Sequence, residues 1–313
     1  MARPVVQLVA TGGTIAMTGT PARPALSGDE LVAAVPELAD VAELKVAQLS
    51  NVPGVNLDPP AMARALAAAS RAEADGMVIT QGTDTIEETA ELAWLTWQRD
   101  EPLVITGAIR PGGSIGSDGP RNLLDAVLFA AAPEGRGLGP AVVFDGLAHS
   151  AGEAVKSHSW RSDAFASEAP IAEIREGRIR PLRTPQQPQP IALTDTNLDA
   201  HVPIIAAAAG MDSRVLDQHA DALVIIGLGA GHLPQTMLAG VDEALAAGIP
   251  VVLCARPEHG GTLERTYGFE GSETDLAERG VILAGDASAW KARIRVLVAL
   301  ALGRDPRELF TDR

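Results

Sequence analysis

Two segments of the sequence place threonines directly after apolar, strand-forming runs. One reads VVQLVATGGTIA and puts Thr14 behind a Gly-Gly pair; the other reads VITQGTDTIEETA and puts Thr83, Asp84 and Thr85 behind Gly82. Glycine lets the backbone turn tightly at such points. Because open α/β sheets bind ligands at the carboxyl ends of their strands, two such turns on neighbouring parallel strands would face one crevice.

The second segment also has a purely structural explanation. Thr85 followed by Glu88 fits a capping box, and Thr and Asp are common N-cap residues. An apolar periodicity typical of a helix continues over residues 86–99. The hydroxyls of this segment could therefore serve only to start a helix.

A threonine hydroxyl is a poor nucleophile until a base removes its proton. Candidate bases are few, because the chain has only three lysines, Lys45, Lys156 and Lys291. Lys156 stands in AGEAVKSHSWRSDAFAS, after the strand-like AVVFDG and among small polar residues. A solvated surface lysine is the alternative, since lysine is almost never buried unless it is paired.

The glycine-rich segments do not match cofactor motifs. ATGGTIA is followed by no Gly-Lys-Ser/Thr, and LVIIGLGAGHLP lacks the third glycine of a dinucleotide-binding turn. The six histidines are scattered, and with the single cysteine they show no metal-ligand spacing. We therefore expect neither a metal nor an organic cofactor.

Short apolar runs alternate with helical periodicities, which predicts βαβ units and a parallel sheet. We expect an α/β protein with two domains: a larger N-terminal, flavodoxin-like parallel-sheet domain over residues 1–180 and a smaller C-terminal α/β domain over residues 201–313. Residues 181–200 between them are rich in Pro and Gln, as is typical of a linker. The expected strands span residues 5–10, 44–49, 76–80, 103–106, 141–144, 223–227, 250–254 and 281–284, and the expected helices span residues 27–35, 60–74, 86–99, 120–132, 233–247, 273–278 and 289–303.

The composition argues against several classes of partner. The 313 residues carry a net charge of −15, which disfavours binding to nucleic acid or to an anionic membrane. No apolar stretch reaches transmembrane length, and the apolar run in MARPVVQLVATGG is too short for a signal peptide, so a cytoplasmic location is expected. The single cysteine, Cys254, lies in the apolar run IPVVLC and is expected to be a buried strand residue.

Taken together, these segments resemble the bacterial L-asparaginase/glutaminase family. ATGGTIA and GTDTIEETA match its two threonine signatures, in the expected order and at a similar separation. GAIRPGGSIGSDGPRNLLDAV matches the loop after its fourth strand, VKSHSWRSDAFAS matches the segment that carries its lysine, and YGF and KARIRVLVALAL match its C-terminal pattern. The resemblance covers nearly the whole chain, and the two threonine motifs together are highly specific.

The resemblance implies hydrolysis of the side-chain amide of L-asparagine to L-aspartate and ammonia, without a cofactor. Thr14 would be the nucleophile that attacks the amide carbon, while Thr83, Lys156 and Asp84 would form an arrangement of nucleophile, base and orienter. Asp84 would also bind the α-ammonium group of the substrate. Backbone N–H groups at Thr83 and near Ala108 would stabilise the oxyanion.

The family also implies a homo-oligomer, in which tight dimers pair into a tetramer and the C-terminal domain of a neighbouring subunit closes each site. By ungapped alignment back from KAR, Glu273 falls where a partner's acidic residue reaches the site. His232 falls where the family usually has asparagine, and an imidazole imitates an amide only in part. The alternative for both is an exposed helix or loop residue.

This sequence departs from the family pattern in two places. The mobile N-terminal loop of the family usually carries a tyrosine that activates the first threonine, but the loop here, MTGTPARPALSGDE, has none, and the only tyrosine is Tyr267. Arg23 on this loop, or Glu273 of a partner, are hypotheses for its replacement. In NVPGVNLDP, Gly54 and Val55 occupy positions where the family usually has Ser and Gln, which contact the substrate α-carboxylate.

Gly54 can still offer its backbone N–H, whereas Val55 offers no side-chain hydrogen bond. A lost contact to a charged group costs about 1.5–3 kcal/mol. We therefore expect a raised KM and weak glutaminase activity.

Two other functions remain open. A glutaminase-like subunit of a transamidation complex usually carries an added N-terminal domain, whereas this chain starts directly on its first strand. A non-catalytic or degenerate amino-acid-binding protein on the same fold is favoured by the loss of the tyrosine and of the Ser/Gln pair. It is disfavoured by the retention of Thr14, Thr83, Asp84 and Lys156.

Overall fold

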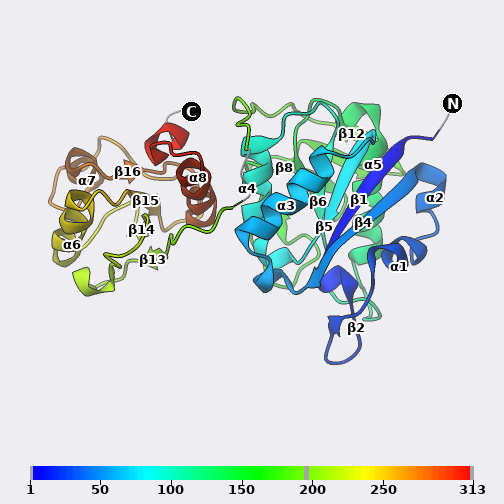
Figure 1. Ribbon diagram of the computed structural model, residues 1–313, viewed down its shortest axis with the longest axis horizontal. Coiled ribbons are helices and arrows are strands. Elements are labelled where there is room, and N and C mark those ends of the chain that lie inside the picture. The colour runs from blue at the N-terminus through cyan, green and yellow to red at the C-terminus, as the bar shows by residue number, and fades with distance from the viewer. Residues whose placement is uncertain (1–2, 194–196, 311–313) are drawn as a thin grey trace. The chain divides into compact units, whose positions relative to one another are not determined.

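An eight-stranded sheet organises the N-terminal part of the chain in the computed structural model, which describes residues 3–193 and 197–310 (Figure 1). The strand order is β12-β11-β8-β7-β6-β5-β1-β4. The strands are β1 (Val5–Gly12), β4 (Glu43–Val52), β5 (Gly76–Thr80), β6 (Leu103–Thr106), β7 (Ala141–Phe144), β8 (Leu147–Ser150), β11 (Ala172–Arg175) and β12 (Arg178–Pro181).

The predicted parallel sheet accounts for five of these strands. β7, β6, β5, β1 and β4 are neighbours in that order and all run parallel. The first strand of the chain thus lies between the second and the third, which is the flavodoxin-like order. In such a sheet the chain reverses its direction of travel between β1 and β5, and ligands bind outside the carboxyl ends of the strands at that point.

The sheet is mixed rather than fully parallel, because β8, β11 and β12 join it in antiparallel pairs. Two tight turns produce these hairpins. Asp145 and Gly146 between β7 and β8 have φ of 49° and 77°, and Glu176 and Gly177 between β11 and β12 have φ of 54° and 72°. Positive φ at both central residues is the geometry of the two-residue turn that matches strand twist.

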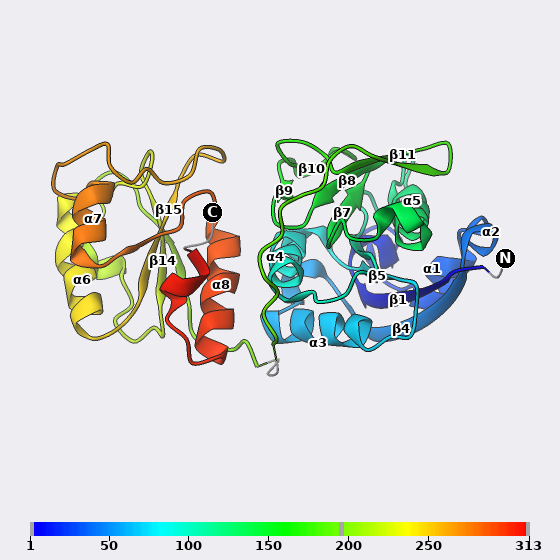
Figure 2. The ribbon, with the colours of Figure 1, turned by 90° about the horizontal axis from the view of Figure 1, so that it is seen from above.

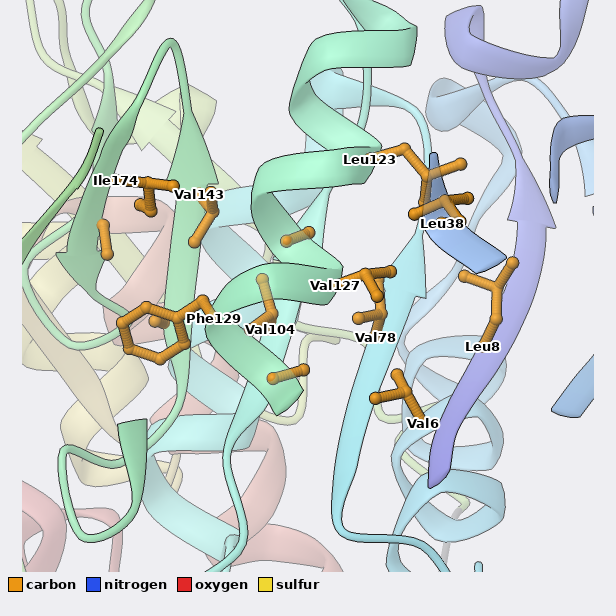
Figure 3. Packing of buried hydrophobic residues seen from close by; sticks show 14 of the residues in the cluster. Val6, Leu8, Leu38, Val78, Val104, Leu123, Val127, Phe129, Val143 and Ile174 are labelled. Carbon is orange, nitrogen blue, oxygen red and sulfur yellow. The ribbon is translucent and has the colours of Figure 1, made fainter. Parts of the chain in front are cut away.

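Helices cover both faces of the large sheet (Figures 1 and 2). One face carries α3 (Pro59–Ser70) and α4 (Ile86–Thr96), and the other carries α1 (Gly28–Ala33), α2 (Leu38–Val41) and α5 (Gly119–Ala131). Under α5, buried apolar side chains from the strands pack against those of the helix and form the core shown in Figure 3. The strands contribute Val6, Leu8, Val78, Val104 and Val143, and the helix contributes Leu123, Val127 and Phe129.

Two small hairpins complete this part of the chain. β2 (Met17–Thr18) pairs with β3 (Arg23–Pro24), and β9 (Val155–Lys156) pairs with β10 (Phe165–Ala166), both antiparallel. Short 3-10 helices lie at η1 (Thr14–Ala16), η2 (Gly54–Asn56), η3 (Thr83–Thr85) and η4 (Pro133–Gly135). Three of these, η1, η2 and η3, come directly after or close behind the parallel strands β1, β4 and β5.

The C-terminal part of the chain is a second α/β unit. Its four parallel strands are β13 (Ile204–Ala206), β14 (Leu223–Gly227), β15 (Val251–Ala255) and β16 (Ile282–Leu283), of which β13 had no counterpart among the expected strands. α6 (Gln235–Ala246) and α7 (Glu273–Arg279) pack on one face, and α8 (Ala289–Ala301) on the other (Figure 2). The unit also contains η5 (Ser213–Val215) and η6 (Pro306–Phe310). Cys254 is fully buried in β15, as its apolar surroundings predicted.

Contacts between Cα atoms divide the chain into units of residues 1–196 and 197–313. Residues 194–196 of the expected linker lie outside the described residues, as do residues 1–2 and 311–313 at the ends of the expected domains. Within the described ranges, no helix combines the length and the apolar character needed to cross a membrane.

Candidate active site

Three glycine-bearing loops touch at the carboxyl ends of β1, β4 and β5. A Cβ atom built on Gly82 would lie 2.3 Å from the Cα of Gly54 and 3.4 Å from the Cα of Gly13. A Cβ on Gly13, whose φ is +85°, would lie 2.1 Å from the backbone nitrogen of Gly82. Real Cβ atoms do not approach backbone this closely, so glycine is required for the contact. Thr14 and Thr83 each follow one of these glycines, and therefore both lie beside the point where ligands bind in this sheet order.

Thr83, Asp84 and Lys156, which the family resemblance implies as one arrangement, meet in one hydrogen-bonded group, and their catalytic roles stay predictions. The ammonium group of Lys156 donates to the Thr83 hydroxyl at 2.8 Å and to an Asp84 carboxylate oxygen at 3.1 Å. Thr83 is buried, the Lys156 side chain is 18% exposed, and the Asp84 side chain is 52% exposed. A hydroxyl within hydrogen-bond reach of an amine that is itself held by a carboxylate is the geometry of an activated nucleophile.

Thr14 has no comparable partner. It begins η1 and is half-buried, and no described residue makes a hydrogen bond with its hydroxyl. Tyr267, the only tyrosine, lies in the second unit. The segment that follows Thr14 folds into the β2–β3 hairpin, in which Arg23 pairs with Thr18 and is exposed. How Thr14 is activated, and whether Arg23 takes part, stay predictions.

The predicted capping box at the start of α4 is wrong. Thr85 is the N-cap residue, but its side chain makes no capping hydrogen bond. Its hydroxyl instead donates to the carbonyl of Gly54 at 3.1 Å. Thr85 therefore ties the loop after β5 to the loop after β4, and the local preference for a capping box gives way to this contact.

The loop after β6 brings Ala108 to the same end of the sheet. A Cβ on Gly107 would lie 2.4 Å from the carbonyl oxygen of Gln81 and 3.4 Å from the Thr83 methyl group, so the two loops are in contact. Ala108 is fully buried. The family resemblance implies an oxyanion-binding N–H near Ala108, and this role stays a prediction.

Two buried polar residues of the segment that starts α5 fix this loop. The Asp118 carboxylate accepts hydrogen bonds from the backbone N–H groups of Ile109 and Arg110 at 2.9 and 2.8 Å. Asn122 is 1% exposed and donates to the carbonyl of Gly107 at 3.1 Å and to Asp118 at 3.0 Å. Neither residue was predicted from the sequence, although both lie in GAIRPGGSIGSDGPRNLLDAV, because their role depends on which loop the helix start meets.

Gly54 and Val55 lie in η2, beside the glycine contact. The Gly54 backbone packs on Gly82, and the Val55 side chain is 71% exposed. An exposed valine at the edge of the site offers no hydrogen bond to a substrate. This placement is consistent with the expected weak contact to a substrate α-carboxylate.

His232 and Glu273 lie together within the second unit. The Glu273 carboxylate is fully buried, accepts the N–H groups of Thr266 and Tyr267 at 2.7 Å each, and lies 3.2 Å from His232 Nε2. Burial would raise the pKa of Glu273, but these N–H groups and the nearby imidazole hold it below its ordinary value. His232 packs edge-on against Tyr267 and Phe269. The expected roles of His232 and Glu273 at a neighbouring site stay predictions.

No three His, Cys, Asp or Glu side chains gather into a metal-binding group within residues 3–193 and 197–310.

Comparison with known proteins places both units in one family. Residues 5–187 match the family model described as Asparaginase, N-terminal, and residues 201–311 match the Glutaminase/Asparaginase C-terminal domain. A probable L-asparaginase of Deinococcus radiodurans is 35% identical over 99% of this chain and 98% of its own length. A glutaminase-asparaginase of Pseudomonas fluorescens is 28% identical over 97% of this chain and 88% of its own length. The crystal structure of a probable cytoplasmic L-asparaginase from Campylobacter jejuni matches with a TM-score of 0.88 and 30% identity, covering 99% of this chain and 100% of the other.

Proposed function

The chain belongs to the asparaginase/glutaminase family of amidohydrolases, and we propose that it hydrolyses L-asparagine to L-aspartate and ammonia. One observation carries the proposal. Lys156 lies 2.8 Å from the Thr83 hydroxyl and 3.1 Å from Asp84, at the end of the sheet where the loop bearing Thr14 also lies. A protein that only binds amino acids does not need a lysine held against a buried threonine.

The proposed reaction has two steps. The Thr14 oxygen bonds to the amide carbon, the carbon–nitrogen bond breaks, and the proton of Thr14 leaves with the departing nitrogen as ammonia. Water then adds to the carbon of the resulting ester, and the bond from that carbon to the Thr14 oxygen breaks. The proton that the water loses passes through the Thr83 hydroxyl, which Lys156 holds, to the Thr14 oxygen, and aspartate is released. Each negatively charged oxygen that forms is stabilised by the N–H groups at Thr83 and near Ala108, a contribution of about 3 kcal/mol per donor.

Ammonia release tests this function. The wild type, Thr14→Ala and Thr83→Ala are compared on L-asparagine, with Thr96→Ala as the matched control. Thr96 lies on α4, and its hydroxyl donates to the Leu92 carbonyl of the same helix at 2.7 Å. We expect activity in the wild type and in Thr96→Ala and its loss in the other two variants. A wild type inert on asparagine would refute the proposal.

The preference for asparagine over glutamine is part of the proposal. Because Val55 cannot hydrogen-bond the substrate α-carboxylate, a high KM and weak turnover of glutamine are expected. Val55→Gln should lower the KM for asparagine by about 10-fold or more, since a hydrogen bond to a charged group contributes about 1.5–3 kcal/mol. Val55→Leu is the matched control without a polar group and should leave the KM high. Equal kcat/KM on the two amides in the wild type would contradict this part.

Assembly and location complete the proposal. We propose a homo-oligomer, a dimer of dimers, in which the C-terminal unit of a neighbour brings His232 and Glu273 towards the site. Sedimentation equilibrium gives the subunit number, and a monomer with full activity would contradict it. We also propose a cytoplasmic location, supported by the structural match to a protein described as probable cytoplasmic L-asparaginase, and cell fractionation tests it.

A non-catalytic amino-acid-binding protein is the second candidate. One observation favours it: no described residue makes a hydrogen bond with the Thr14 hydroxyl. If the wild type releases no ammonia but binds L-aspartate in calorimetry, this candidate replaces the first.

A further inference from the structure

Glu87 stands one helical turn beyond Thr83, in the first turn of α4, and contacts Lys156. One oxygen of its carboxylate accepts the backbone N–H of Lys156 at 3.0 Å. The ammonium group of the same lysine donates hydrogen bonds to Thr83 and Asp84 at 2.8 and 3.1 Å. The start of α4 therefore holds Lys156 at both ends, by its backbone and by its side-chain tip.

The segment that carries Lys156 is otherwise held by its neighbour in the hairpin, because the Ser157 N–H donates to the Ala164 carbonyl at 2.8 Å. β9 has two residues and pairs only with β10, in a two-stranded sheet separate from the eight-stranded one. Phe165 of β10 stacks on Phe144 of β7 with ring centroids 4.5 Å apart, which anchors the outer strand of the hairpin. On the side of β9 that faces α4, the backbone N–H of Lys156 donates to the Glu87 carboxylate. β10 and Glu87 therefore hold the main chain of the lysine together.

We propose that Glu87 is a positioning residue for the amide hydrolysis, which acts by holding the Lys156 backbone so that its amine meets the Thr83 hydroxyl. The inference rests on the proposed function. A charge-assisted hydrogen bond to a carboxylate is among the stronger ones in proteins. Without it, β9 can shift, and a shift of about 1 Å at a catalytic group can cost roughly 100-fold in rate.

The helix dipole gives a purely structural reason for an acidic residue at this place. Glu88 shares that reason, because it lies in the same first turn of α4. A comparison of the two positions therefore separates the effect of helix charge from the effect of the contact to Lys156.

Steady-state kinetics on Glu87→Ala, Glu87→Gln and Glu88→Ala test the proposal. Gln keeps an oxygen that accepts the N–H of Lys156, so we expect Glu87→Gln to retain kcat within about 5-fold. We expect Glu87→Ala to lower kcat by about 10- to 100-fold with KM changed less than 3-fold, and Glu88→Ala to resemble the wild type. An equal loss in Glu87→Ala and Glu88→Ala would overturn the proposal.

A double-mutant cycle shows whether Glu87 acts through Lys156. In a Lys156→Met background, Glu87→Ala should lower the remaining ammonia release by less than 2-fold, because the group it positions is gone. A residue that merely stabilises the fold would cost the same factor in both backgrounds. Equal factors would therefore overturn the proposal.

A measurement independent of activity completes the test. The chain has three lysines, so selective ¹⁵N-lysine labelling gives three backbone signals, and Lys156→Arg identifies the one from position 156. Hydrogen exchange of that amide should be at least 10-fold faster in Glu87→Ala and little changed in Glu87→Gln. Unchanged exchange in Glu87→Ala would overturn the proposal. If the wild type releases no ammonia, the proposed function fails, and this exchange experiment alone decides whether Glu87 holds Lys156.

Discussion

Replacing Gly82 by alanine should separate the loops of the site without removing any functional group. The added methyl carbon would lie 2.3 Å from the Cα and 2.4 Å from the nitrogen of Gly54, both of which belong to the backbone. Ordinary contact needs about 3.4 Å or more, so the two loops must move apart by about 1 Å. Gly82 has a φ of −68°, which alanine adopts freely, so the clash alone causes the effect.

This displacement should lower mainly kcat. A shift of about 1 Å between Thr83 and the substrate predicts a loss of roughly 100-fold in kcat, whereas overpacking costs about 1–3 kcal/mol of folding free energy. Gly76→Ala is the matched control. It lies at the opposite end of β5, and its methyl carbon would lie 1.9 Å from the Ala130 carbonyl oxygen.

Ammonia release and urea unfolding are measured on both variants. Both should lose stability, but only Gly82→Ala should lose kcat at a temperature where both remain folded. If Gly82→Ala kept kcat within 3-fold of the wild type, the tight contact between these loops would not be what positions the catalytic groups.

Two further perturbations test buried polar residues of the N-terminal unit. Burial lowers the pKa of His149, on β8, from its ordinary 6.5 to about 4. The unfolded state therefore binds the proton more tightly than the folded state. The free energy of unfolding should fall by about 3 kcal/mol as the pH drops from 6.5 to 4. His149→Asn should flatten this slope in urea unfolding, and an unchanged slope would refute the assignment. Asn122→Leu removes two buried hydrogen bonds, to Gly107 and Asp118, and a partly buried one from Asp145, and should cost about 3–5 kcal/mol of unfolding free energy. A loss below 1 kcal/mol would show that the loop after β6 is fixed by other contacts.

The parallel part of the large sheet was predictable because its strands are short apolar runs, each followed by a helical periodicity. Each of those signals is local. The antiparallel strands were missed although two sequence signals were present, Asp145-Gly146 and Glu176-Gly177. Asp-Gly is a preferred dipeptide of two-residue hairpins, whereas in Glu176-Gly177 only the glycine is one of the preferred residues. The second pair lies just before the Pro- and Gln-rich stretch, and its flanking strands, AEIR and RIRP, alternate apolar with charged residues and form no apolar run.

The group around Lys156 was anticipated through the family motifs, because spacing alone does not bring position 156 to position 83. Thr85 shows the opposite case. Its sequence context fits a capping box, yet its hydroxyl donates a hydrogen bond to the carbonyl of Gly54, which is distant in the sequence. Glu87 stands in the same quoted segment, but its contact is with a backbone N–H, which every residue except proline carries. No pattern of residue types could have pointed to that partner.

The burial of Cys254 has a practical consequence for watching the protein at work. The only thiol of the chain is fully enclosed in β15, so the native sequence already lacks a surface site for maleimide dyes. Val55→Cys would supply one at a position that is 71% exposed and one residue from the contact between Gly54 and Gly82. A fluorophore there would follow the arrival and departure of ligand in real time, with no cysteine to remove beforehand.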